Sequence, residues 1–109
     1  MKNTRLPWLT WPALERIRVW GDLSQKRVLE WGSGGSTLYW TDRKVAELMT
    51  IEHDPEWALQ VIKLLGNTIG WSLCLVRPSE SDFPLYASSL YPGMCFWRYA
   101  TLPMDLDLK

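Results

Sequence analysis

The sequence has no excess of positive charge, because its 109 residues include 12 Lys and Arg against 12 Asp and Glu. It therefore lacks the basic field that draws proteins to nucleic acids and to anionic membranes. Long apolar runs are also absent, and the opening segment is interrupted by Pro7 and Pro12 and becomes charged at Glu15, unlike a signal peptide. We expect neither a membrane partner nor nucleic acid as an obligate partner.

Cysteine and histidine are scarce as well. Cys74 and Cys95 lie far apart and lack a second pair with metal-type spacing, so neither a zinc site nor a disulfide framework is indicated. We expect no metal and a reducing, cytoplasmic location. Hydrophobic residues make up 47% of the chain, enough for one domain with a buried core. Eight tryptophans are many for this length, and we expect most of them in the core or at an interface.

Helical patterns occur three times in residues 10–66. The first helix is predicted from the capping Thr10 to about Trp20, and the second over residues 36–44. The third begins at the Asp54-Pro55 pair and ends at Gly66. The residues expected on the buried faces of the first and third helices are Trp11, Leu14 and Ile17, and Ala58, Val61, Ile62 and Leu65.

Three short apolar runs alternate with these helices and predict strands at residues 27–31, 48–54 and 71–76. This alternation is typical of an α/β fold with a parallel sheet and right-handed crossovers. The strands lack a polar face, as in a sheet covered on both sides. We divide the single domain into a leading helix and loop (1–26), a β-α-β-α-β unit (27–77) and an irregular tail (78–109).

A glycine-rich loop follows the first strand and opens the second helix. Its glycines, at positions 32, 34 and 35, allow a sharp turn or the close approach of a ligand to the backbone. Glu52 lies 20 residues beyond Gly32, at the end of the second strand, where a carboxylate can accept hydrogen bonds from both hydroxyls of a ribose. Together, the loop and Glu52 predict a nucleotide site.

Two residues favour a nucleotide without phosphate. The dinucleotide fingerprint requires glycine where this chain has Thr37, and Glu30 would repel a pyrophosphate but could hold an ammonium group. S-adenosylmethionine carries an ammonium, a sulfonium, a ribose and an adenine, and it has no phosphate. We therefore prefer it to NAD, although a fragment of an NAD-dependent oxidoreductase stays an alternative.

The two motifs resemble those of class I S-adenosylmethionine-dependent methyltransferases, in particular bacterial methyltransferase-like proteins with E-x-G-S-G-x-S-T and E-H-D-x-x-W motifs. Here they read EWGSGGST over residues 30–37 and EHDPEW over residues 52–57. The segment PWLTWPALERI is also similar to the leading helix of that family, so the resemblance extends over about residues 7–76.

The resemblance implies a Rossmann-like fold that binds S-adenosylmethionine and transfers its methyl group to an acceptor that no residue identifies. It places Glu52 on the ribose and His53 and Asp54 beside the adenosine, with His53 as a neighbour of the site rather than a base. The loop residues expected around the methionine portion are Glu30, Gly32, Ser33 and Gly34, and the rest of the loop motif assigned to the cofactor site is Gly35, Ser36 and Thr37.

The chain departs from this family after the third strand. Such enzymes have further strands and loops that build the acceptor pocket, whereas here only residues 103–109 resemble the opening of a fourth strand. We expect an incomplete sheet whose first strand exposes an unpaired apolar edge at residues 28–31 and promotes self-association. The leading interpretation is the cofactor-binding portion of a methyltransferase. The alternative is a noncatalytic or truncated module that pairs with a partner chain.

Overall fold

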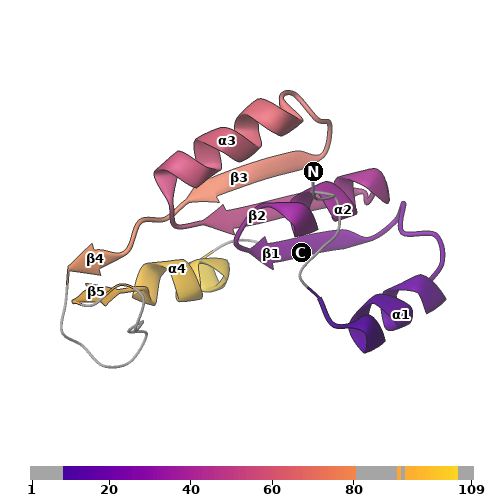
Figure 1. The fold of residues 1–109 in the computed structure, drawn as a ribbon, viewed down its shortest axis with the longest axis horizontal. Coiled ribbons are helices and arrows are strands. Elements are labelled where there is room, and N and C mark those ends of the chain that lie inside the picture. The colour runs from indigo at the N-terminus through magenta and orange to yellow at the C-terminus, as the bar shows by residue number, and fades with distance from the viewer. Residues whose placement is uncertain (1–8, 81–90, 92, 106–109) are drawn as a thin grey trace.

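The computed structural model describes residues 9–80, 91 and 93–105. Its centre is a parallel sheet of three strands in the order β1-β2-β3 (Figure 1). The strands are β1 (Arg27–Trp31), β2 (Glu47–Glu52) and β3 (Trp71–Leu75). They alternate with the helices α1 (Trp11–Val19), α2 (Gly35–Asp42) and α3 (Pro55–Leu65). The predicted α/β class and incomplete, Rossmann-like parallel sheet are confirmed.

The predicted starts of α1 and α3 are also confirmed, because each has a side-chain cap, whereas α2 begins at Gly35, one residue before its predicted start, with Gly34 as N-cap. The Thr10 hydroxyl accepts a hydrogen bond from the Ala13 amide at 3.3 Å. Asp54 accepts from the amides of Glu56 and Trp57 at 3.0 and 3.2 Å. Each of these bonds satisfies an amide that has no partner inside its own helix.

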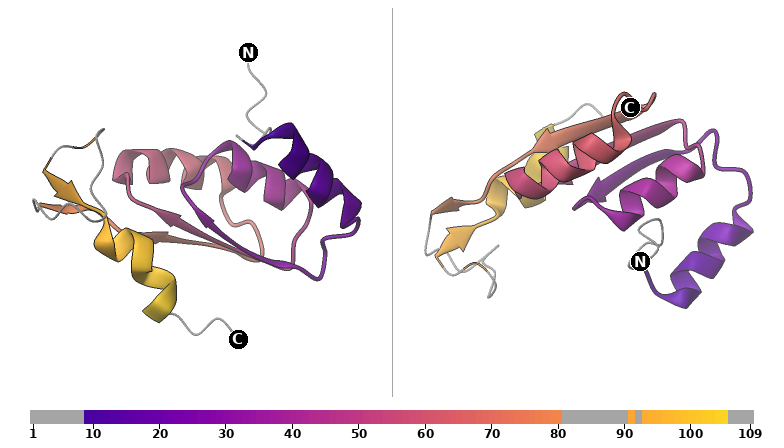
Figure 2. Two further views of the ribbon diagram at one scale, coloured as in Figure 1. Left: turned by 90° about the horizontal axis from the view of Figure 1, so that it is seen from below. Right: turned by 45° about the horizontal axis from the view of Figure 1, so that its top comes forward.

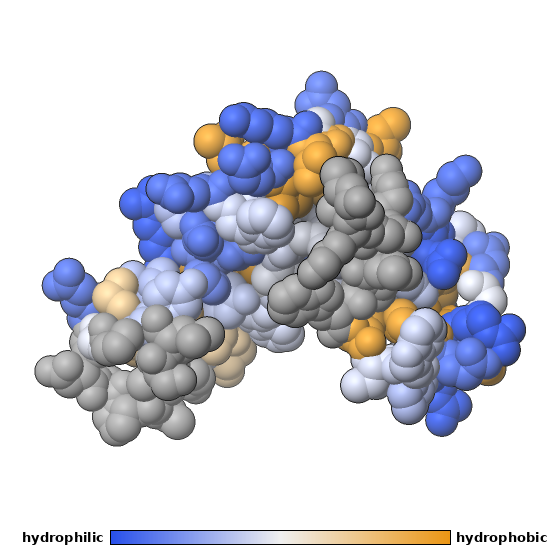
Figure 3. All heavy atoms as spheres, viewed as in Figure 1, coloured by the Kyte–Doolittle hydropathy of each residue, from blue (hydrophilic) through white to orange (hydrophobic). Residues whose placement is uncertain are grey.

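The buried stripes of the helices are narrower than predicted. In α1 only Ile17 is buried, and it packs with Leu23 and Tyr39, whereas Trp11 is 82% exposed. In α3 the residues that reach the core are Ala58 and Val61, while Ile62 is 43% exposed. Figure 3 shows apolar side chains at the surface over α3. The apolar spacing was correct, but the sheet has only three strands and meets a narrow stripe of each helix.

The tryptophans do not form the core. Trp40 and Trp71 are partly buried. The other described tryptophans each expose 45% or more of their surface: Trp11, Trp20, Trp31, Trp57 and Trp97. The fully buried large side chains are instead Leu48, Ile51, Val61, Thr37 and Thr50. Most of the described tryptophans therefore lie outside the core, and their predicted place at an interface stays a prediction.

One face of the sheet is covered unevenly. The crossovers from β1 to β2 and from β2 to β3 have the same handedness, and each moves one strand further across the sheet. Helices α2 and α3 therefore lie on the same face of the sheet (Figure 2). Arg27, Glu47 and Ser72 are exposed near the amino ends of the strands. At the carboxyl ends, Ile51 is fully buried. Within the described residues, the expected double covering is therefore wrong for the amino end of the sheet.

Part of the predicted irregular tail is ordered into short elements. Strands β4 (Ser79–Glu80) and β5 (Met94–Cys95) pair in antiparallel fashion, and α4 (Trp97–Thr101) and the 3-10 helix η1 (Leu102–Asp105) follow. The predicted opening of a fourth strand is wrong for residues 103–105, which are helical, and residues 106–109 lie outside the described residues. The β4–β5 pair returns the chain toward the sheet, and α4 lies on the face opposite α2 and α3 (Figure 2).

Candidate functional site

The glycine loop joins β1 to α2 at the carboxyl end of the sheet. Gly32 and Gly34 have φ angles of +82° and +139°, which side chains of L-residues rarely permit. The Gly32 amide donates to the Ile51 carbonyl at 2.7 Å, so the loop begins as a continuation of the β1–β2 pairing. Gly35 and Ser36 form the first turn of α2, and both are partly buried.

Glu30 lies beneath this loop and is only 8% exposed. Its Oε2 accepts hydrogen bonds from the hydroxyls of Thr37 and Thr50, at 2.6 and 2.7 Å. The other oxygen, Oε1, is buried, and no group in residues 9–80, 91 or 93–105 donates a hydrogen bond to it. Burial raises the pKa of Glu30, the two threonine hydroxyls lower it in part, and the charge of Glu52 adds to the increase. Glu30 therefore offers a buried acceptor to a donor that the described residues do not supply.

The threonines around Glu30 connect it to the loop and to β3. The Thr37 hydroxyl also accepts from the Gly34 amide at 3.0 Å, and the Trp71 indole donates to the Thr50 hydroxyl at 3.0 Å. Both threonine side chains are fully buried. The hydroxyl of Thr37 thus makes two hydrogen bonds, to Glu30 and Gly34, that a glycine at this position could not make.

Glu52 holds the loop against β2. Its Oε1 accepts from the amide and hydroxyl of Ser33, at 2.8 and 2.6 Å. Its Oε2 accepts from the amides of His53 and Asp54, at 2.9 and 3.0 Å. A carboxylate has about four acceptor positions, and here all are used. A ribose would bind to Glu52 only by replacing one of these donors, and the Ser33 hydroxyl is the one that can rotate away.

Aromatic side chains of this chain approach both glycines. A side chain on Gly34 would place its Cβ 3.3 Å from the Trp57 ring, and one on Gly32 would lie 3.8 Å from the Tyr99 hydroxyl. The Trp57 indole also donates to the Ser33 carbonyl at 2.7 Å. The absence of a side chain at Gly34 therefore allows Trp57 to pack closely, and Gly32 and Gly34 each have one aromatic residue nearby.

His53 follows β2 and contacts a cluster of aromatic residues from the tail. The centroid of its ring lies 5.4 Å from those of Tyr91 and Tyr99 and 5.2 Å from that of Phe96, in edge-to-face geometry. The Trp31 indole donates to the Tyr99 carbonyl at 2.9 Å, which attaches α4 to the end of β1. Burial, and then the charges of Glu52 and Glu30, raise the pKa of Tyr99 to about 12. Tyr99 is therefore a neutral phenol at physiological pH.

The predicted site residues come together at one edge of the sheet. Glu30, the loop of residues 32–37 and Glu52 share the hydrogen bonds described above, and His53 and Asp54 follow directly. Sequence reasoning missed Thr50 and Tyr99. Thr50 had a signal, because it is a polar residue in an apolar strand and lies on the same face as Glu52. Tyr99 had none, since its position depends on the return of the chain through β4 and β5.

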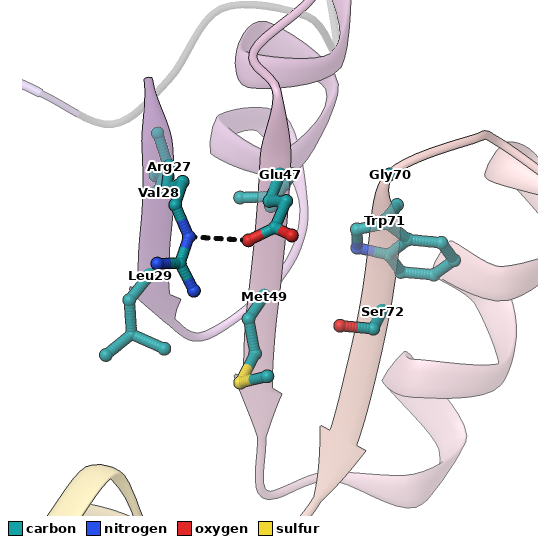
Figure 4. Close-up of a pocket in the computed structure, with 9 residues that line it drawn as sticks. Arg27, Val28, Leu29, Glu47, Met49, Gly70, Trp71 and Ser72 are labelled. Atoms are coloured by element: carbon teal, nitrogen blue, oxygen red, sulfur yellow. Dashed lines mark hydrogen bonds and ion pairs between the residues drawn. The ribbon is translucent and has the colours of Figure 1, made fainter. Parts of the chain in front are cut away.

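A concave region lies at the end of the sheet opposite the glycine loop (Figure 4). It is a hollow of about 590 Å³ near the amino ends of the strands, lined by residues that include Leu29, Met49 and Trp71. The Arg27 guanidinium and the Glu47 carboxylate meet beside it at 2.6 Å. Ligands of open α/β sheets bind at the carboxyl ends of the strands, so we assign the candidate site to the glycine loop and not to this hollow.

Comparison of the chain with models of protein families, with curated proteins and with solved structures found no match. None of the helices in the described part of the chain is long and apolar enough to cross a membrane. Those same residues contain no group of three or more side chains placed to hold a metal ion. The loop and its carboxylates are therefore the features from which a function can be inferred.

Proposed function

We propose that the carboxyl end of this sheet binds S-adenosylmethionine and that the chain is the cofactor-binding portion of a methyltransferase. The observation that carries this proposal is the buried Glu30 oxygen without a partner, directly beneath the glycine loop. A carboxylate at this depth favours a cationic donor over any phosphate. The ammonium group of the methionine portion is such a donor.

The other residues fit the cofactor with one local change. Glu52 would take the ribose hydroxyls after the Ser33 hydroxyl turns away from it. His53 and Asp54 would lie beside the adenosine, although Asp54 already caps α3. Bound S-adenosylmethionine supplies an electrophilic methyl group, and the residues of this chain would hold the molecule for an acceptor that we leave open.

Isothermal titration calorimetry tests this proposal. We expect saturable binding of S-adenosylmethionine or its demethylated product, S-adenosylhomocysteine, and weaker or no binding of NAD. Replacing Glu30 with Gln, which retains the shape of the side chain but not its charge, should weaken binding by about tenfold, the scale of a hydrogen bond to a charged group. Tighter binding of NAD would refute the proposal.

The second candidate function is a noncatalytic module that pairs with a partner chain. It is favoured by the order of the sheet, in which β1 and β3 are both terminal strands, and by the exposed apolar side chains over α3 (Figure 3). A chain that binds no nucleotide but forms a defined complex through β1 would support this candidate. In either case we propose a cytoplasmic location, because Cys74 and Cys95 are both free thiols.

A further inference from the structure

The α4 segment lies where a ligand on the glycine loop would meet a second wall. Its Tyr99 hydroxyl lies 3.8 Å from the position that a Cβ on Gly32 would occupy. The chain reaches this position from the tail, through β4, β5 and Phe96. Residues that are distant in sequence from both motifs therefore border the same edge of the sheet as Glu30 and Glu52.

Several contacts fix Tyr99 in this position. Its backbone carbonyl accepts from the Trp31 indole at 2.9 Å, and its ring contacts the rings of His53 and Phe96 in edge-to-face geometry. The distance of 3.8 Å from the Tyr99 hydroxyl to a Cβ placed on Gly32 would be ordinary van der Waals contact rather than overlap. Trp57 packs against Gly34, and its indole donates to the Ser33 carbonyl, so the two glycines flanking Ser33 each have an aromatic side chain nearby.

We propose that α4 forms a ligand-facing wall of the site and that Tyr99 contacts bound S-adenosylmethionine beside Gly32, where it positions the methionine portion. This inference depends on the proposed function. A tyrosine combines a flat apolar ring with a hydroxyl that donates or accepts a hydrogen bond. Because its pKa is about 12, the phenol stays protonated at neutral pH and acts as a donor.

Binding of S-adenosylmethionine to three variants of the full chain tests the role of Tyr99. Tyr99→Phe removes the hydroxyl and keeps the ring, and it should weaken binding about threefold to tenfold, the effect of one lost hydrogen bond. Tyr99→Ala removes both and should weaken binding more strongly. The matched control is Tyr91→Phe, which removes a hydroxyl from the same aromatic cluster at a residue that is 41% exposed. This control should change binding less than about twofold.

The outcomes separate the two proposals. If the wild-type chain binds neither S-adenosylmethionine nor S-adenosylhomocysteine, the proposed function fails and this inference fails with it. If the wild type binds and Tyr99→Phe binds equally well, only the role of Tyr99 is refuted. Tighter binding by Tyr99→Ala would show that the ring obstructs the site and would also overturn the inference. If a denaturant titration shows that Tyr99→Ala is already unfolded in the absence of denaturant, the result for Tyr99→Phe alone decides.

Discussion

At the scale of single residues, the site is organised by two buried carboxylates with different roles. Glu52 uses its four acceptor positions within the chain, whereas Glu30 has one oxygen without a partner. Burying a charged group without compensation is costly. The cost at Glu52 is offset by its four donors, while that at Glu30 is only partly offset. Glu52 is therefore chiefly a structural clamp, and Glu30 is the better candidate for ligand recognition.

Because Glu52 holds the loop against β2 through these hydrogen bonds, we expect a large loss of stability when Glu52 is replaced with Ala. The substitution leaves the backbone amides of Ser33, His53 and Asp54 without their acceptor, and we expect the free energy of unfolding to fall by about 3 kcal/mol. The matched control is Glu47→Ala on the same strand, where an exposed ion pair with Arg27 should contribute less than about 1 kcal/mol. If denaturant titrations show the same loss in free energy of unfolding for both substitutions, the structural role of Glu52 is contradicted.

The raised pKa of Glu30 predicts how stability changes with pH. Above the ordinary value of 4.5 an unfolded Glu30 loses its proton before the folded one does, so stability should fall as the pH rises from about 4.5 through the folded pKa. Glu30→Gln cannot ionise. Its free energy of unfolding should therefore improve relative to the wild type over that window, and then stay at a constant difference.

Paired denaturant titrations across this pH range check the prediction for Glu30. Glu15 and Asp22 have lowered pKa values, so they change stability in the opposite direction and in a more acidic window. Both residues are present in the wild type and in the variant, and their effects cancel in the comparison. If the difference in free energy of unfolding between the two proteins does not vary with pH, burial does not raise the pKa of Glu30 as described.

At the scale of elements, the loop and the start of α2 depend on Gly34. Its φ of +139° is unfavourable for a residue with a side chain, and a Cβ would approach the Trp57 ring to 3.3 Å. We expect Gly34→Ala to lower the free energy of unfolding by about 1–3 kcal/mol and to weaken nucleotide binding. Gly35→Ala is the control, because Gly35 is part of α2, where alanine is favoured by up to about 1 kcal/mol. If both variants are equally stable, the loop is not constrained as described.

The elements of residues 10–75 followed from local signals in the sequence. Thr10 and Asp54 mark helix starts because their side chains satisfy orphan amides, and the apolar run of residues 27–31 is β1 itself. The position of the carboxylates also followed, since parallel strands end at one edge. The tail did not follow, because β4 and β5 are two residues each and their pairing depends on contacts distant in sequence.

The errors in predicted burial have one physical cause. Trp11, Ile62 and one face of β1 were expected to be covered because their patterns are apolar, and a pattern does not report how much surface a partner offers. A sheet of three strands offers little surface for these side chains to pack against. The same limit explains why Tyr99 was missed, since nothing in the spacing of residues 97–101 points toward Gly32.

At the scale of the whole molecule, the exposed apolar surface predicts self-association. Strands β1 and β3 end the sheet, and Leu29 lines the hollow on its open side (Figure 4). Edge strands with free backbone groups pair readily with other chains. Light scattering on the wild type should therefore give a mass above the 12.7 kDa of one chain.

A charged substitution in β1 locates the surface responsible for that association. Leu29→Lys places a charge on the edge strand, which should reduce the measured mass toward one chain. Leu64→Lys, on an α3 residue that is 65% exposed, adds the same charge away from β1 and should have little effect. A wild-type chain that is monomeric at all concentrations would contradict the prediction, as would equal effects of the two substitutions.

Binding of S-adenosylmethionine by the glycine loop and its carboxylates is the proposal on which the other binding predictions depend. The most direct test follows the backbone and indole N–H signals of the isotope-labelled chain by NMR during titration with this ligand. We predict saturable shifts of the amides of Gly32, Ser33 and Gly34 and of the Trp57 indole, with little change in α1. Absence of saturable shifts at the loop would contradict the account, as would shifts confined to the hollow beside Arg27 and Glu47.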